Sequence, residues 1–142
     1  QIDDYVGKNP KFSFFYMGRL PDGFQFKNSE YLPAIGDIDS MAGILSNSDI
    51  YVTASEEEAG ANHVLEALAS GLPILYHDNG GSILNYCDNY GIGYENFDDF
   101  IGALDKMVNK FSFYKNKALG FDKNIENVVE QYKEIICNTK ST

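Results

Sequence analysis

Two glutamates lie where a loop meets a helix in the middle of the sequence. Glu58 ends a run of three acids, and Glu66 follows after seven further residues, within a predicted helix that starts at Asn62. A carboxylate about one turn into such a helix can face the crevice at its N-terminus and accept hydrogen bonds from two vicinal hydroxyls, as on a ribose. Glu58, at the loop tip, can meet the hydroxyls of a second group. The pair therefore predicts a ligand rich in hydroxyl groups.

The backbone between the two glutamates predicts an anion site. Gly60 permits a positive φ or close backbone approach, and Asn62 can cap the helix with its side chain. Free N–H groups at a helix N-terminus, together with the helix dipole, suit a diphosphate. The alternative is that acids precede this helix because the dipole favours them, and that a helical glutamate is simply solvated. Glu56 and Glu57 are predicted to be surface charge.

Short apolar runs alternate with amphipathic segments along the chain. The predicted strands cover 11–18, 30–35, 50–54, 73–77 and 92–94, and the predicted helices cover 2–9, 39–48, 62–70, 82–90, a segment from 98 or 99 to about 111, and 124–137. This alternation predicts an α/β, Rossmann-like fold: one parallel sheet with helices on both faces, in a single domain over residues 1–142. Ligands of such sheets bind beyond the C-terminal ends of strands. The loops expected there are 20–28, 55–61 and 78–81.

Local signals refine the predicted boundaries. Side chains able to cap the remaining helices are Asp37 or Asp39, Ser82, and Asp98 or Asp99. Gly71 stands where a glycine follows a helix end. Pro33 cannot donate to a central ladder, so the strand 30–35 is expected near an edge or broken within its run.

Composition restricts the function classes. The 142 residues carry a formal net charge of −10, which disfavours binding to nucleic-acid phosphates and to anionic membranes. Cys87 and Cys137 form no metal-binding pattern, so no metal site and reduced thiols are expected. No apolar run reaches the roughly 18–20 residues of a membrane span, and the N-terminus does not resemble a signal peptide. The cytoplasm is the expected compartment.

Other reactive side chains support weaker predictions. His63, at the helix start, can touch a ligand, with a capping or surface role as the alternative. His77 and Asp78 end a strand at the ligand face, where a structural role is the alternative for the histidine. Ser55 and Ser82 lack a nucleophile elbow, and the Gly-rich loop at 79–82 is neither a P-loop nor a dinucleotide fingerprint.

The segment 55–81 resembles the signature region of retaining glycosyltransferases with the GT-B fold, the E-x7-E class of glycosyl transferases group 1. The matches are the glutamates Glu58 and Glu66, the Glu-Ala pair at 66–67, the Gly-x-Pro at 71–73 and the Gly-Gly loop at 80–81. The strand 50–54 resembles the lead-in to this motif. The resemblance extends more loosely from the strand 11–18 to the strand 92–94.

This resemblance implies the donor-binding, C-terminal half of a GT-B enzyme. Such an enzyme moves a sugar from a nucleotide diphosphate sugar to a saccharide or lipid-linked acceptor with retention and without a metal cofactor. By the same resemblance, Glu66 holds the ribose and Glu58 contacts the donor sugar as the catalytic residue. The backbone positions implied at the diphosphate or sugar, and the Gly-Gly loop of the same crevice, are Ala59, Gly60, Ala61, Asn62, Gly80 and Gly81.

The sequence also departs from the family pattern. The usual Gly-Phe-Gly is Ala-Gly-Ala at 59–61, and the acid expected after the Gly-Gly loop falls at Leu84. Arg19 is either the arginine that reaches the diphosphate in this family or an ordinary loop residue. The second alternative is favoured, because the strand before Arg19 resembles the second strand of the family domain. The resemblance therefore implies that the first strand, its diphosphate-binding cations and the N-terminal acceptor domain are missing, and that the chain alone is inactive.

Three alternatives to a glycosyltransferase domain remain at the level of the sequence. One is a non-catalytic sugar-nucleotide-binding module, another a GT-B-like epimerase fragment, and a third a flavodoxin-like interaction domain. A GT-B-like phosphorylase is disfavoured, because the sequence does not contain the lysine motif that binds the phosphorylase cofactor. The nucleotide, the sugar and the acceptor are not predicted.

Overall fold

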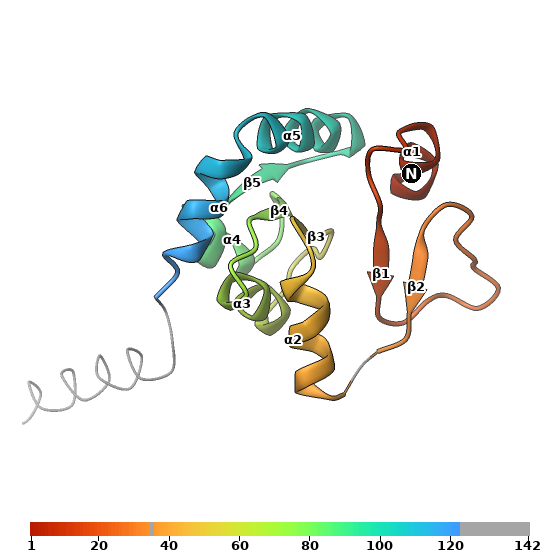
Figure 1. The fold of residues 1–142 in the computed structure, drawn as a ribbon, viewed down its shortest axis with the longest axis horizontal. Coiled ribbons are helices and arrows are strands. Elements are labelled where there is room, and N and C mark those ends of the chain that lie inside the picture. Colours follow the sequence, from red (N-terminus) through yellow and green to blue (C-terminus); the bar gives the residue numbers. More distant parts are fainter. Residues whose placement is uncertain (35, 123–142) are drawn as a thin grey trace, which may run out of the picture. The chain divides into compact units, whose positions relative to one another are not determined.

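The computed structural model describes residues 1–34 and 36–122 (Figure 1). The chain divides into two compact units, Gln1–Ile44 and Leu45–Thr142. The boundary falls within helix α2, Ile38–Ser46. Each unit is built on a parallel sheet, and each is described by itself.

The N-terminal unit contains a helix and two strands. Helix α1 (Ile2–Lys8) is followed by strands β1 (Phe15–Met17) and β2 (Glu30–Leu32), which pair in parallel with Phe15 opposite Glu30. β2 ends directly before Pro33, as expected from a residue without an N–H group. The break within the predicted strand is therefore confirmed.

A carboxylate in α1 organises the loop between these two strands. Both oxygens of Asp3 accept hydrogen bonds from backbone N–H groups, one from Lys27 and one from Asn28, each at 2.9 Å. The Asn28 side-chain amide donates back to the Asp3 carbonyl at 3.1 Å. Arg19 is exposed at the start of this loop.

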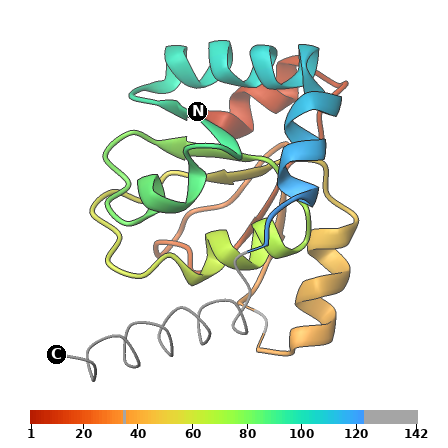
Figure 2. The same cartoon turned by 90° about the vertical axis from the view of Figure 1, so that its left-hand side faces the viewer.

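The C-terminal unit is a three-stranded parallel sheet with helices packed against it. Its strands, in the order β3–β4–β5, are Tyr51–Thr53, Ile74–His77 and Gly91–Tyr94. Its helices are α3 (Asn62–Ala69), α4 (Ile83–Cys87), α5 (Phe97–Asn109) and α6 (Phe111–Leu119). α3 and α5 lie on opposite sides of the strands (Figure 2), and α6 contacts both helices.

The core of this unit explains why the central strand is so apolar. β4 pairs with a neighbour on each side, and its first two residues, Ile74 and Leu75, are fully buried. A strand covered on both faces needs a continuous apolar run rather than alternation. Leu72 and Pro73, directly before β4, are also fully buried. The helices contribute the fully buried side chains of Val64, Leu68, Ile83, Cys87 and Met107.

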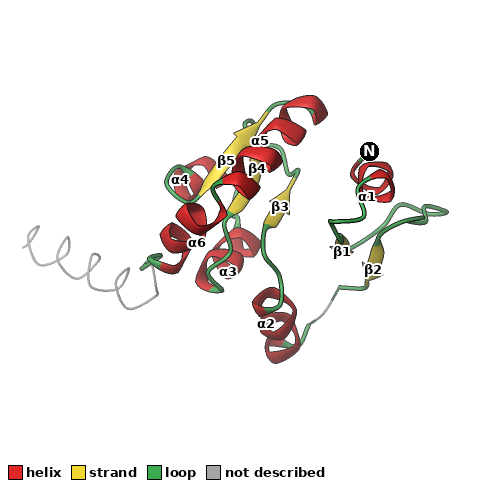
Figure 3. Ribbon diagram, turned by 45° about the horizontal axis from the view of Figure 1, so that its top comes forward, coloured by secondary structure: helices red, strands yellow, loops and turns green. Residues whose placement is uncertain are grey.

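The predicted fold class is confirmed, with one difference. Both sheets are parallel and helices flank them, as the alternation of elements predicted (Figure 3). The hydrogen-bonded ladders, however, form two sheets, one of two strands and one of three, rather than one continuous sheet. The first four strands are shorter than predicted because only three or four residues of each apolar run enter a ladder, whereas β5 begins one residue earlier than predicted, at Gly91.

Two of the predicted helix caps need correction. α5 is capped by Asn96, whose side-chain oxygen accepts from the backbone N–H groups of Asp98 at 3.0 Å and Asp99 at 3.1 Å. The two aspartates are therefore in the first turn and do not cap it. Ser82 does occupy the N-cap position of α4, but its hydroxyl makes no capping hydrogen bond.

Other boundaries are confirmed or extended. Asp37 caps the start of α2 by accepting from the Ser40 N–H at 2.8 Å. α3 ends at Ala69, and Gly71 beyond it has a positive φ of 71°, as a glycine after a helix end should. α6 was not predicted as a separate helix. The predicted helix 124–137 lies outside the described residues.

Candidate functional site

Two loops meet at the C-terminal ends of β3 and β4. The N–H of Glu57 donates to the carbonyl of Asn79, and the N–H of Ser82 donates to the carbonyl of Glu58, both at 2.9 Å. These two bonds join the loop 55–61 to the loop 78–82 backbone to backbone. The sequence predicted that both loops lie at this edge of the sheet, and the structure confirms it.

Gly81 makes this close approach possible. Its φ is +63°, and a Cβ atom on it would lie 2.7 Å from the Glu58 carbonyl oxygen and 2.9 Å from the Glu58 nitrogen. On the other loop, Glu57 has a φ of 55°, which is uncommon for a residue with a side chain. The local backbone is therefore held in unusual conformations where the loops touch.

The ends of the strands fix the start of the first loop. The Ser55 N–H donates to the Thr53 hydroxyl oxygen at 3.3 Å, and the buried Tyr94 hydroxyl donates to the Thr53 carbonyl at 2.9 Å. Burial raises the pKa of Tyr94 to about 12, so its hydroxyl stays protonated and remains a donor. β3 and β5 are thereby tied together beneath the loop.

His77 fixes the start of the second loop. Its Nδ1 accepts from the Asn79 N–H at 3.1 Å, so Nε2 carries the ring proton and donates to the Glu95 carbonyl at 3.1 Å. The same Nε2 lies 3.6 Å from a carboxylate oxygen of Glu56. His77 thus has a structural role, which was one of the two roles predicted for it.

The Glu58 carboxylate is held at the start of α3. One oxygen accepts from the Gly60 N–H at 3.3 Å, and the other lies 3.9 Å from Nε2 of His63. About a third of the Glu58 side chain is exposed, so the carboxylate can still reach a ligand.

Glu66 is exposed further along α3, where its backbone carbonyl accepts from the Ser70 hydroxyl at 2.9 Å. Its carboxylate forms no hydrogen bond or ion pair with any described residue. It follows His63 by three residues, and residues three apart lie next to each other on a helix surface. Its carboxylate is therefore free for a ligand on the side of the helix that carries His63.

The start of α3 differs from the prediction. Ala61 occupies the N-cap position and Asn62 is the first helical residue, so Asn62 does not cap the helix. The N–H groups of Asn62 and Val64 donate to the carbonyls of Gly60 and Ala61, both at 3.0 Å. Two of the donors expected to bind an anion are therefore already used by the chain itself.

The apex of the loop is open. Ala59 and Gly60 are exposed, and no atom lies within 4 Å of a Cβ placed on Gly60. Gly60 does not have the positive φ that the sequence allowed; Glu57 has it instead. A ligand can therefore approach the backbone here without a side chain in its way.

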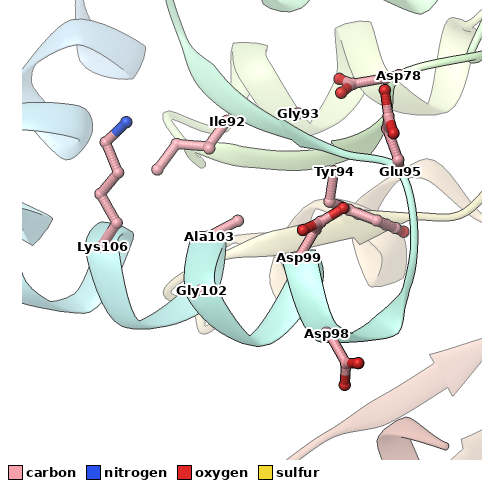
Figure 4. A pocket seen from close by; sticks show the side chains of 10 residues that line it. All are labelled: Asp78, Ile92, Gly93, Tyr94, Glu95, Asp98, Asp99, Gly102, Ala103 and Lys106. Carbon is pink, nitrogen blue, oxygen red and sulfur yellow. The ribbon is translucent and has the colours of Figure 1, made fainter.

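A separate hollow of about 390 Å³ lies beside β5 and the start of α5 (Figure 4). Its charged lining residues are four acids and one lysine, namely Asp78, Glu95, Asp98, Asp99 and Lys106. Asp78 alone belongs to the paired loops. The hollow does not include Glu58 or Glu66, so the candidate site is defined by the loops. Among residues 1–34 and 36–122, no group of three or more His, Cys, Asp or Glu side chains is placed to hold a metal ion.

Sequence reasoning missed part of this site. Glu57 is exposed, as its assignment to surface charge predicted, but that assignment missed the Glu57 backbone, which forms one of the two hydrogen bonds between the loops. Sequence reasoning also did not connect Tyr51 with His63, although the Tyr51 hydroxyl lies 3.1 Å from Nδ1 of that histidine. Twelve positions separate these two residues, and only the return of α3 onto β3 brings them together.

The fold and the site define the class of this chain: a Rossmann-like α/β domain whose candidate site lies at the carboxyl ends of parallel strands. The profile of one family, described as Glycosyl transferases group 1, matches residues 6–110. The chain belongs to this glycosyltransferase family. A search of curated proteins found no match. None of the described helices has the length and apolar character needed to span a membrane.

Proposed function

We propose that this chain is the donor-binding domain of a retaining glycosyltransferase of the E-x7-E class. The protein transfers a sugar, of the hexose type, from a nucleotide diphosphate sugar to a saccharide or lipid-linked acceptor. One observation carries the proposal: the backbone pairing of the loops 55–61 and 78–82, which places Glu58 at the open edge of the sheet in a member of this family.

The two glutamates have separate roles in this proposal. Glu66, whose exposed carboxylate has no partner among the described residues, accepts hydrogen bonds from the two ribose hydroxyls. Glu58, whose carboxylate is already oriented by Gly60 and His63, contacts the donor sugar beside the reacting carbon. The two carboxylates thereby fix opposite ends of the donor.

The diphosphate lies between them in the proposal. Ala59 and Gly60 in one loop and Gly81 in the paired loop are exposed, and backbone N–H groups suit phosphate oxygens. The N–H groups of Gly60 and Gly80 already donate to the Glu58 carboxylate and the His77 carbonyl, so the proposal assigns the phosphate contact to those of Ala59 and Gly81. Of the two residues predicted at the helix start, Ala61 stays in this role and Asn62 does not, because the Asn62 N–H already donates to the Gly60 carbonyl. The proposed transfer requires no metal cofactor, and the acceptor hydroxyl attacks the anomeric carbon with retention. Acceptor binding is assigned to a separate domain.

Titration with matched ligand pairs tests the proposal. NMR or thermal-shift titrations with UDP, GDP and ADP, and with UDP-glucose, GDP-mannose and ADP-glucose, should show saturable binding of at least one pair. Glu66→Ala should abolish the response to the nucleoside diphosphate with the fold intact. Asp105→Ala, which removes an exposed carboxylate from α5, is the matched control and should bind as the unmodified chain does.

An unchanged affinity in Glu66→Ala would count directly against the ribose role. Equal affinity for the nucleoside diphosphate and its sugar conjugate would mean that the chain does not recognise the sugar. The chain would then be a nucleotide-binding module and not a donor-binding domain. Turnover is a separate measurement: the chain by itself should neither transfer the sugar nor hydrolyse the donor at a measurable rate.

A further inference from the structure

We propose that His63 is a positioning residue for Glu58 and that Tyr51 fixes the ring of His63. This inference rests on the proposed function, because it assigns a purpose to the orientation of the Glu58 carboxylate. It extends the site from the loop back to strand β3.

The first contact joins β3 to α3. The Tyr51 hydroxyl lies 3.1 Å from His63 Nδ1, and the two ring centroids are 6.0 Å apart. Tyr51 stands at the start of a strand whose backbone pairs with β4, so its ring is carried by the sheet. The histidine is therefore oriented by a rigid element and not by the loop.

The second contact selects the tautomer of the histidine. If Nδ1 carried the proton, the unprotonated Nε2 would present its lone pair to the Glu58 carboxylate 3.9 Å away. If the tyrosine hydroxyl donates to Nδ1, Nε2 carries the proton and directs it at that carboxylate. The second arrangement avoids placing a lone pair against an anion, so it is favoured.

The third contact holds the remaining oxygen of the carboxylate. Oε1 of Glu58 accepts from the Gly60 N–H at 3.3 Å, while Oε2 is the oxygen that faces His63. A separation of 3.9 Å is too long for a hydrogen bond and acts as an electrostatic attraction. The carboxylate is thus restrained from both sides before any ligand arrives.

This arrangement affects recognition more than stability. The His63 and Glu58 side chains are 34% and 32% exposed, so solvent weakens their attraction. A small orienting force still matters in binding, because a carboxylate held in place loses less freedom when it accepts hydrogen bonds from a sugar. Loss of His63 should therefore weaken contacts to the sugar and leave contacts to the nucleotide unchanged.

The test uses two substitutions that imitate different ring nitrogens. In His63→Gln the side-chain amide nitrogen can take the place of Nε2 and direct a proton at Glu58. In His63→Asn the shorter side chain reaches only the place of Nδ1. The measured quantity is the ratio of affinities between a sugar nucleotide and its nucleoside diphosphate, for the pair that binds best among UDP with UDP-glucose, GDP with GDP-mannose and ADP with ADP-glucose.

We expect His63→Asn to reduce this ratio about two- to fivefold, the range of one partly exposed ion pair, and His63→Gln to restore most of it. Affinity for the nucleoside diphosphate should stay within about twofold in both variants. Glu58→Gln, measured beside them, separates the two proposals. If it changes the ratio and neither His63 variant does, the inference is wrong and the proposed function stands.

If Glu58→Gln leaves the ratio unchanged, the sugar role of Glu58 fails, and the inference fails with it. A chain that binds none of the six ligands overturns both. An independent readout is the ¹⁵N spectrum of the His63 ring at neutral pH, which should show a protonated Nε2. Tyr51→Phe should mix the two tautomers, and a ring already protonated at Nδ1 in the unmodified chain would overturn the inference.

Discussion

At the scale of single residues, the candidate site depends most on Gly81. Its positive φ and the nearby Glu58 backbone leave no room for a side chain. Gly81→Ala should therefore destabilise the fold by roughly 1–3 kcal/mol from backbone strain, or push the two loops apart to avoid the clash. Urea denaturation measures the first outcome, and loss of the ligand response described above measures the second.

Gly60→Ala is the matched control for this prediction. It makes the same change in the other loop, at a position with no positive φ and with no atom within 4 Å of the added methyl group. Its stability should stay within about 0.5 kcal/mol of the unmodified chain, as for an ordinary surface substitution. If both alanine variants behave alike, the loop contact does not depend on the Gly81 conformation.

At the scale of the elements, α5 depends on a cap that the sequence did not identify. Asn96 accepts from two N–H groups of the first turn, which no carbonyl of the helix can satisfy. Asn96→Ala should destabilise the fold by about 1 kcal/mol, within the usual range for a lost cap. The midpoint of urea denaturation measures this change.

The control for Asn96→Ala keeps an acceptor in place. Asn96→Ser retains a side-chain oxygen that can reach the same N–H groups, so it should recover most of the lost stability. Asp is a poorer choice, because the Asn96 amide donates to the Asp99 carboxylate at 2.6 Å and a second carboxylate there would be repelled. Equal losses in the Ala and Ser variants would show that the cap contributes little.

The contribution of α3 to the core is tested by one buried leucine. Leu68 is 1% exposed, so Leu68→Ala should leave a cavity and cost roughly 2–5 kcal/mol. Leu84→Ala makes the same change on α4, where the side chain is 39% exposed, and should have a much smaller effect. Equal effects in urea denaturation would contradict the assignment of α3 to the core.

Comparison of these elements shows what the sequence could predict. The apolar run at 73–77 and the glycine after α3 are local signals, and both predicted the correct element. The cap of α5 was misassigned by two or three positions because asparagine and aspartate are both good caps, and only the fold decides between them. The break between α5 and α6 at Lys110 carries no proline or glycine, so the sequence did not mark it.

For the candidate site, too, the sequence predicted the general position but not the contacts that depend on the fold. That the loops 55–61 and 78–81 share one edge follows from the strand order alone, and the sequence predicted it. The sequence did not predict the contacts at that edge, such as the hydrogen bonds between the two loops, because they join residues that are distant in the sequence. Glu57 is the clearest example, because its importance comes from its backbone and not from the charge that the sequence displays.

At the scale of the whole molecule, buried ionisable groups determine the response to alkaline pH. Burial raises the pKa of the Cys87 thiol from 9.0 to about 12 and that of the Tyr94 hydroxyl from 10.0 to about 12. Burial, reinforced by the negative charge that Cys87 would carry, also raises the pKa of Tyr76. The folded C-terminal unit therefore keeps these three groups neutral at pH values at which the same groups would ionise in the unfolded chain.

The sign of the effect follows from proton linkage. The unfolded chain releases these protons near pH 9 and pH 10, whereas the folded chain retains them up to about pH 12. The folded state thus binds more protons in this interval, and its stability falls as the pH rises. The expected slope is roughly 1.4 kcal/mol per pH unit for each group, with the full stability present below pH 9. Urea denaturation at pH 8, 9, 10 and 11 measures it.

Cys87→Ala separates this linkage from general charge repulsion. The net charge of −10 becomes more negative as lysines lose their protons, which destabilises any variant and is screened by 0.5 M salt. At that salt concentration Cys87→Ala should be less stable than the unmodified chain at pH 8, because it leaves a cavity, yet lose stability less steeply between pH 9 and pH 10. In that interval Cys87 is expected to titrate in the unfolded chain before Tyr94 does. Parallel curves for the two proteins would show that the thiol is not held protonated by the fold.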